Sequence, residues 1–200
     1  MNKTRKAFAV ILACAVMLLM TACGKVAFEH GSWNGQTYTS EYFGFTVKGD
    51  ANWKVVTDDG LAKLNDINDM SPDNIKSVLN KGGLMEMKLS KSQGGGITIF
   101  VYDNEKRPDY REFQYIDARL KDVEDKYGSL KTINCIAKKS TIDFLGVLTV
   151  CVETETNLRG LGTSYGYEIP VVKGNYTASI VISSMNKSDL DMLAKRFSAL

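Results

Sequence analysis

Hydrophobic and polar positions alternate along much of the chain, which is typical of half-buried strands. Phe43, Phe45 and Val47 fall on one side of the extended run 42–47, and the run 53–56 repeats the pattern. Met85, Met87 and Leu89 are likewise expected on one strand face. The remaining alternating or β-rich runs predict strands over residues 97–102, 132–138, 147–156, 165–172 and 176–183.

Apolar residues at helical spacing predict four helical segments. A weak one covers residues 61–67, and a second begins at Ser71-Pro72 and ends at Gly82. The strongest runs from Asp109, which with Glu112 resembles a capping box, to residue 128. Its apolar stripe consists of Phe113, Ile116, Leu120, Val123 and Tyr127. A terminal helix from residue 186 places four apolar side chains on one face: Leu190, Leu193, Phe197 and Leu200.

The order of these elements indicates the fold class. Successive strands joined by short turns pair antiparallel, and amphipathic helices must cover at least one face of the sheet. We therefore expect an α+β protein with a single domain, built mainly of antiparallel β-sheet covered by amphipathic helices.

The first 22 residues have the pattern of a secretory signal. A basic start is followed by an unbroken apolar run of 14 residues, 7–20, which is short of the roughly 20 that a membrane-spanning helix needs. Leu19-Met20-Thr21-Ala22-Cys23 then resembles a bacterial lipobox, in which the cysteine is diacylglycerated and becomes the mature N-terminus. Two acyl chains would give stable anchoring in a membrane. An ordinary signal peptide with an accidental Cys23 is the alternative.

The expected organisation is a signal peptide over 1–22, a lipidated cysteine with a flexible tether over 23–36, and a globular domain over 37–200. The stretch 24–35 shows no clear period and could extend about 40 Å at roughly 3.3–3.6 Å per residue. The protein is thus expected outside the cytoplasm, held at the membrane by its lipid.

Charge argues against a nucleic-acid partner. The whole chain has a formal charge of +2, but residues 23–200 hold 22 basic and 23 acidic side chains. Contacts with nucleic-acid phosphates normally require a clear basic excess. The expected partners are the membrane and, beyond it, an envelope protein or polymer.

Catalytic and metal-binding patterns are weak. His30 is the only histidine, and it falls within the expected tether, so a rigid Ser/His/Asp or Cys/His arrangement is not expected. The soft metal ligands show no close pairs of the kind that zinc sites use. We expect no catalytic residue, no metal and no cofactor.

Cys135 and Cys151 are candidates for a disulfide in an extracytoplasmic domain. A hairpin turning near residues 144–146 would put Cys135 opposite Glu155 and Cys151 opposite Lys139. The two thiols would then lie about 13 Å apart at roughly 3.3 Å per residue, which is too far for a disulfide. A bridge needs a turn centred at Asp143. Two buried, unbridged thiols are the alternative.

Tyr165 and Tyr167 fall on one face of a predicted strand. Aromatic residues with polar tips are frequent in binding surfaces, and they also suit an interface between sheet and helix. Both interpretations stay open.

The segment from Tyr38 through 42–47, followed by Trp53-Lys54-Val55, resembles the opening of PsbP-like domains. The late turn at Gly174-Asn175-Tyr176 with a closing helix fits the same order of elements. The chain has residues 48–52 where the family often shows a Pro before the Trp. The resemblance implies an antiparallel sheet between helices. Within this group, the chain is similar to small lipoproteins of Gram-positive bacteria with no assigned activity. The resemblance carries over no functional residue.

Together these patterns favour a non-enzymatic, membrane-anchored binding or accessory module of the cell envelope. An envelope hydrolase with carboxylates assembled by folding, or a receptor for a small ligand, are the alternatives.

Overall fold

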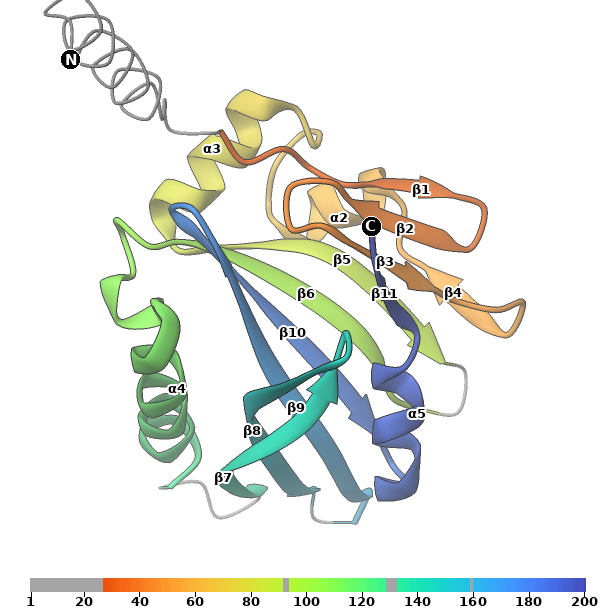
Figure 1. The fold of residues 1–200 in the computed structure, drawn as a ribbon, viewed down its shortest axis with the longest axis vertical. Coiled ribbons are helices and arrows are strands. Elements are labelled where there is room, and N and C mark those ends of the chain that lie inside the picture. Colours follow the sequence, from red (N-terminus) through yellow and green to blue (C-terminus); the bar gives the residue numbers. More distant parts are fainter. Residues whose placement is uncertain (1–26, 92–93, 129–132, 159) are drawn as a thin grey trace, which may run out of the picture.

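Two antiparallel sheets form the body of the protein in the computed structural model, which describes residues 27–91, 94–128, 133–158 and 160–200 (Figure 1). The expected signal peptide and the lipidation site Cys23 lie outside the described residues. The smaller sheet has the order β1-β2-β3-β11 and the larger one the order β4-β5-β6-β10-β9-β8-β7. The predicted antiparallel pairing is confirmed.

The sequence-predicted strands are recovered, although the first begins at Phe45 and not at residue 42, and three short strands, β1, β2 and β11, are added. The small sheet comprises β1 (Ser32–Asn34), β2 (Thr37–Ser40), β3 (Phe45–Lys48) and β11 (Phe197–Ala199). The large sheet comprises β4 (Trp53–Val55), β5 (Gly83–Lys91), β6 (Gly96–Asp103), β7 (Ile133–Phe144), β8 (Val147–Leu158), β9 (Gly162–Lys173) and β10 (Tyr176–Ser184).

Helices pack against both faces of the large sheet. They are α2 (Asp58–Leu64), α3 (Pro72–Lys81), α4 (Glu112–Tyr127) and α5 (Leu190–Ala194), with single 3-10 turns over Pro108–Tyr110 and Lys187–Asp189. One face of the sheet carries α4, which contacts β7, β8 and β9. Across the other face, α3 contacts β5 and β6, and α5 contacts β9 and β10.

The main core lies between the two sheets. Phe45 and Val47 of β3 are fully buried there with Leu89 of β5 and Ile180 of β10. A smaller cluster fills the opposite face, where Tyr115 and Ile116 of α4 pack on Val152 of β8. Adjacent residues of a strand point to opposite faces, so the neighbouring Cys151 belongs to the main core.

A β-bulge changes the predicted face of β5. The register against β6 shifts between Met85 and Met87, which leaves Glu86 as the extra residue. Two successive side chains, Glu86 and Met87, are then buried, and Leu84 replaces Met85 in the core. The expectation that Met85 shares the buried face with Met87 is therefore wrong.

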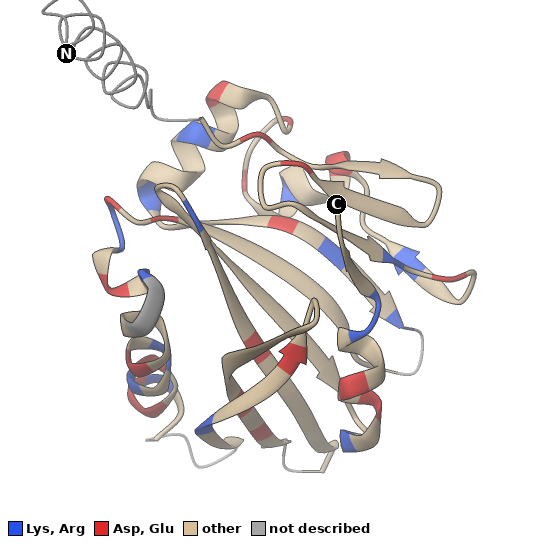
Figure 2. Cartoon of the chain, in the orientation of Figure 1, with Lys and Arg blue, Asp and Glu red and all other residues tan. Residues whose placement is uncertain are grey.

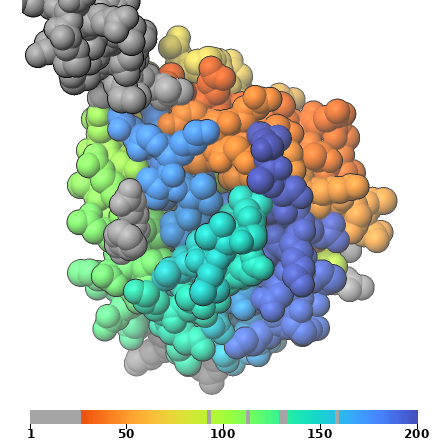
Figure 3. Space-filling view, in the orientation of Figure 1, coloured from red at the N-terminus to blue at the C-terminus, as the bar shows by residue number. Residues whose placement is uncertain are grey.

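Two predicted helix boundaries are also wrong. Helix α4 begins at Glu112 with Arg111 as its N-cap, so Asp109 lies in the preceding 3-10 turn and forms no capping box. The terminal helix ends at Ala194, and Phe197 is buried in β11, where it pairs with Val47. Figure 3 shows this last segment beside the β7–β8 hairpin, where the Phe144 and Phe197 ring centroids lie 5.0 Å apart.

The β7–β8 hairpin turns at Leu145-Gly146, one residue away from the register we expected. Cys135 pairs with Thr156 and Cys151 with Ser140. Both cysteines are free, Cys151 fully buried and Cys135 half-buried. Burial raises the pKa of the Cys151 thiol to about 11, with a further contribution from the charge of Glu153.

Candidate functional site

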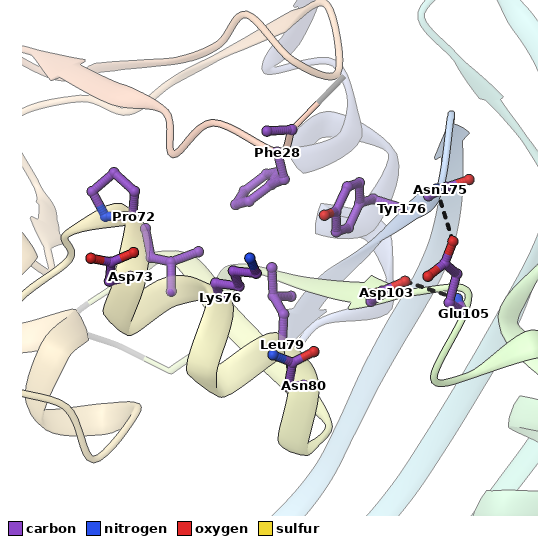
Figure 4. A pocket seen from close by; sticks show the side chains of 12 residues that line it. Phe28, Pro72, Asp73, Lys76, Leu79, Asn80, Asp103, Glu105, Asn175 and Tyr176 are labelled. Carbon is purple, nitrogen blue, oxygen red and sulfur yellow. Dashed lines mark hydrogen bonds between the residues drawn. The ribbon is translucent and has the colours of Figure 1, made fainter. Parts of the chain in front are cut away.

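A cleft of about 310 Å³ opens where the N-terminal segment joins the body (Figure 4). Helix α3, the turn after β6, the β9–β10 turn and the N-terminal segment each contribute a wall. The lining residues are Ala27, Phe28, Pro72, Asp73, Ile75, Lys76, Leu79, Asn80, Asp103, Glu105, Asn175 and Tyr176. Its volume is at the lower end of the range for small-molecule sites.

Helix α3 forms the first wall. Asp73, Lys76 and Asn80 follow one another at helical spacing, so they share one side of the helix. Ile75 and Leu79 are 4% exposed and join the main core, which fixes how α3 lies on the sheet. The cleft thus has an apolar base with polar groups along its rim.

The second wall is a turn held by hydrogen bonds. Asp103 accepts a hydrogen bond from the Glu105 amide at 2.8 Å, which forms an Asx turn. The amide of buried Asn104 donates to the Asn175 carbonyl at 2.8 Å, and its side chain accepts from the Thr177 hydroxyl at 2.9 Å. Two turns far apart in sequence are therefore joined into one rigid edge.

Aromatic rings close the third side. The Phe28 ring centroid lies 5.6 Å from that of Tyr176 and 5.5 Å from that of Tyr42. The Tyr42 hydroxyl donates to the Lys173 carbonyl at 3.0 Å. Figure 4 shows Phe28 reaching in from the N-terminal segment, with Tyr176 across from α3.

The β9–β10 turn depends on a glycine. Gly174 has φ +58, and a Cβ there would lie 2.9 Å from the Tyr42 hydroxyl oxygen. Any side chain at this position would strain the backbone and press on the aromatic wall.

Carboxylates outnumber ammonium groups around the cleft. Among the described lining residues, Asp73, Asp103 and Glu105 are acidic and Lys76 is basic. The Asn175 amide donates to Glu105 at 3.4 Å. The site combines a net negative rim with aromatic and aliphatic walls.

The N-terminal segment is held to the sheet by Glu86, which is 1% exposed. Its carboxylate accepts hydrogen bonds from His30 Nδ1 at 2.8 Å, the Gly31 amide at 2.8 Å and the Tyr38 hydroxyl at 2.5 Å. We call these four residues the Glu86 cluster. His30 Nε2 also lies 3.4 Å from Asp58. The expectation that His30 lies in a flexible tether is therefore wrong, since residues 28–34 pack on the body and β1 pairs with β2.

The pKa of His30 reflects this position. Burial acts to lower it, but the hydrogen bond and the charge of Glu86, with Asp58, outweigh burial and raise the pKa above its ordinary value. Burial, with Glu86 beside it, raises the pKa of Tyr38 well above its usual range. Tyr38 is thus a neutral donor, and the surroundings of His30 favour its cationic form.

A second buried carboxylate lies on the opposite face of the sheet, beneath α4. Glu168 is 6% exposed and accepts from Arg119 Nε at 2.7 Å, Arg119 Nη2 at 3.0 Å and the Ser179 hydroxyl at 2.8 Å. The Tyr115 hydroxyl also donates to it. We call Glu168, Tyr115, Arg119 and Ser179 the Glu168 cluster. Burial, followed by the charge of Glu168, raises the pKa of Tyr115 well above its usual range.

Neither cluster has the arrangement of an acid–base pair. Glu86 and Glu168 are the two buried carboxylates of the described residues, and each accepts several hydrogen bonds from the protein. They lie on opposite faces of the sheet, so they cannot act on one substrate. This geometry stabilises the fold and gives the hydrolase alternative no specific support.

Tyr165 and Tyr167 lie on the same face of β9, as the alternation predicts. Both are half-buried against the main core. Burial and the charge of Asp191 in α5 raise the pKa of Tyr167 to about 12. They are placed at the interface between sheet and helix, away from the residues that line the cleft.

None of the cleft residues is among the sequence-predicted site residues. Their positions, near 28, 75, 104 and 175, are far apart in the sequence, and only folding brings them together. Within the described ranges, His, Cys, Asp and Glu do not gather into a group that could hold a metal ion. The helices described here are all too short or too polar to cross a bilayer.

These features define a class: a small α+β protein of two antiparallel sheets, with a ligand-sized amphipathic cleft beside the N-terminal segment. No family model and no curated protein matches the chain. Among solved structures, it is similar to the solution structure of cyanobacterial PsbP (CyanoP) from Synechocystis sp. PCC 6803. That match has 13% sequence identity and a TM-score of 0.49, and covers 90% of this chain and 98% of that chain. We transfer neither a site nor an activity from this match.

Proposed function

We propose that this protein is a lipid-anchored, extracytoplasmic binding module of the cell envelope, and that it acts by holding a small ligand without transforming it. The observation that carries this proposal is the position of the cleft. Ala27 lines it, and Cys23 precedes Ala27 by four residues. Four residues span at most about 14 Å at roughly 3.3–3.6 Å per residue.

The ordered N-terminal segment shortens the tether that the sequence indicated. Phe28 packs on Tyr176, and His30 is bound to Glu86, so free chain can exist only before these contacts. A diacylated Cys23 would therefore hold the cleft close to the lipid headgroups, where it could receive a ligand from the membrane surface or from the surrounding medium.

Binding fits the cleft better than catalysis does. Its walls are aromatic and aliphatic with a few polar groups, as in small-molecule sites. The histidine and the two buried carboxylates are engaged elsewhere in the fold. This supports the small-ligand form of the binding module.

Replacement of the lipidated cysteine tests the anchor. In a bacterial host, we expect the native chain in the membrane fraction, with the mass of two or more acyl chains on a mature protein that begins at Cys23. Cys23→Ala should be released from the membrane without acyl mass. Cys14→Ala is the matched control, since it removes a cysteine within the expected signal peptide and should leave lipidation intact. Membrane retention of the Cys23→Ala protein would contradict the proposal.

A further inference from the structure

The cleft's charge and shape together indicate the chemical class of its ligand. Among the described residues that line it, three carry carboxylates, Asp73, Asp103 and Glu105, and one, Lys76, carries an ammonium group. A cleft lined mainly by one sign of charge concentrates ligands of the opposite sign. An anionic ligand would meet repulsion from two walls.

The apolar walls of the cleft also favour a ligand that has an apolar part next to its positive charge. Phe28, Ile75 and Leu79 present carbon surface, and the rings of Phe28 and Tyr176 stand close together. Aromatic faces attract cations as well as apolar groups. A ligand that is charged all over would leave this surface unused.

We propose that the cleft binds a ligand with one ammonium group on a short apolar body, an inference that rests on the proposed binding function. The ammonium group lies toward the Asp103–Glu105 turn, and the apolar body lies against Phe28 and α3. The rigid joining of the two turns through Asn104 and Asn175 keeps the carboxylates in place before the ligand arrives. Such a group could come from a soluble amine or from the headgroup of an aminophospholipid.

The test compares three probes of the same size and different charge: phenethylammonium, 2-phenylethanol and phenylacetate. The lipidated protein in phosphatidylglycerol nanodiscs is titrated with each, and the amide signals of Asn175 and Tyr176 are followed by NMR. Exposed ion pairs contribute up to about 1 kcal/mol each, so phenethylammonium should bind about 3- to 10-fold more tightly than 2-phenylethanol. Phenylacetate should bind most weakly.

Variants of the rim charges give effects of opposite sign. Glu105→Gln should weaken phenethylammonium binding about 2- to 5-fold, and Lys76→Gln should strengthen it by a similar factor. Asp117→Asn makes the same kind of change on the exposed side of α4 and should change nothing. A Lys76→Gln variant that binds the amine more weakly would overturn the assignment.

The outcomes separate this inference from the proposed function. If all three probes bind within twofold of one another, the cleft is a binding site but the preference for ammonium is refuted. If none shifts the signals of the cleft, the cleft is not a small-ligand site and the binding proposal itself fails.

A further arm identifies the source of the amine. Phosphatidylethanolamine added to the nanodiscs should shift the same signals and weaken phenethylammonium binding if the headgroup is the ligand. If phosphatidylethanolamine does not compete with phenethylammonium, the ligand is assigned as a soluble amine.

Discussion

The two buried carboxylates, one on each face of the large sheet, differ in the cation that balances them. Glu168 is paired with a guanidinium that forms two hydrogen bonds with it, whereas Glu86 is paired with an imidazole. A guanidinium stays charged at any ordinary pH, but an imidazole titrates near neutrality. The same burial therefore produces a fixed attachment beneath α4 and a pH-dependent one beneath the N-terminal segment.

The difference matters because of what each cluster holds. The Glu168 cluster joins α4 to β9 and β10, within the body of the protein. The Glu86 cluster holds the segment that brings Phe28 to the cleft. Weakening of the Glu86 cluster should therefore reach the cleft, and weakening of the Glu168 cluster should not.

The largest effect is expected from Arg119→Ala. It leaves the Glu168 carboxylate buried without its cation, and breaking a buried pair in this way typically costs about 3–5 kcal/mol. Urea denaturation should show this loss in the free energy of unfolding. Lys121→Ala removes an exposed partner of Asp125 on the same helix and should change stability little. Figure 2 shows acidic and basic residues interspersed along α4. A small loss for Arg119→Ala would mean that the hydroxyl donors alone satisfy Glu168.

The next largest effect is expected at Gly31. A Cβ there would lie 2.3 Å from the Tyr38 hydroxyl oxygen and 2.5 Å from the Thr39 carbonyl oxygen. Gly31→Ala must therefore displace β1 or the Tyr38 side chain, and such overpacking costs about 1–3 kcal/mol. Denaturation should show the loss, and the NMR signal of Tyr176 should shift as Phe28 moves. Ser32→Ala, on the exposed side of β1, should do neither. Unchanged stability in Gly31→Ala would mean that the segment is not held as described.

Much of the fold could be predicted from the sequence, because local periodicity determines it. The alternation of Phe43, Phe45 and Val47 identifies a buried face that the structure confirms. Ser71-Pro72 and Gly82 mark the ends of α3 correctly. Hairpin pairing then follows from short turns between strands.

The Glu86 cluster could not be predicted, since one extra residue decides it. In a regular strand, Glu86 would point away from Met85 and Met87, as an exposed residue does. The bulge places Glu86 on the buried side, where His30 and Tyr38 reach it. No local sequence pattern around His30 indicates that it binds Glu86, which is 56 residues away.

The Glu168 cluster did leave a signal. Tyr115, Arg119 and Asp122 recur at helical spacing beside the apolar stripe of α4, and Arg119 bonds Asp122 at 3.1 Å. A polar stripe next to an apolar one can mark a buried network, but it cannot name the strand residue that completes it. The cleft could not be predicted, because its walls come from four separate segments and no local pattern places them together.

The two clusters should also differ in how their contribution to stability depends on pH. The folded pKa of His30 is raised, so the stability that it contributes is fully present below the unfolded value of about 6.5 and is lost as pH rises through the folded pKa. His30→Gln should therefore cost about 1–2 kcal/mol at pH 5.5 and clearly less at pH 8.5. Denaturation of both proteins at the two pH values measures this. The cost of Arg119→Ala, by contrast, should be the same at both. A cost of His30→Gln that does not depend on pH would mean that the imidazole binds Glu86 as a neutral donor.

The smallest effects are expected from the two tyrosine hydroxyls. Tyr38→Phe leaves Glu86 with His30 and Gly31, and Tyr115→Phe leaves Glu168 with Arg119 and Ser179. Each removes one of several donors, so each should cost about 1 kcal/mol in denaturation. Tyr115→Phe should cost less than Tyr38→Phe, because the guanidinium already forms two charge-assisted bonds with its carboxylate. The reverse order would show that the hydroxyl, and not the choice of cation, sets the strength of each cluster.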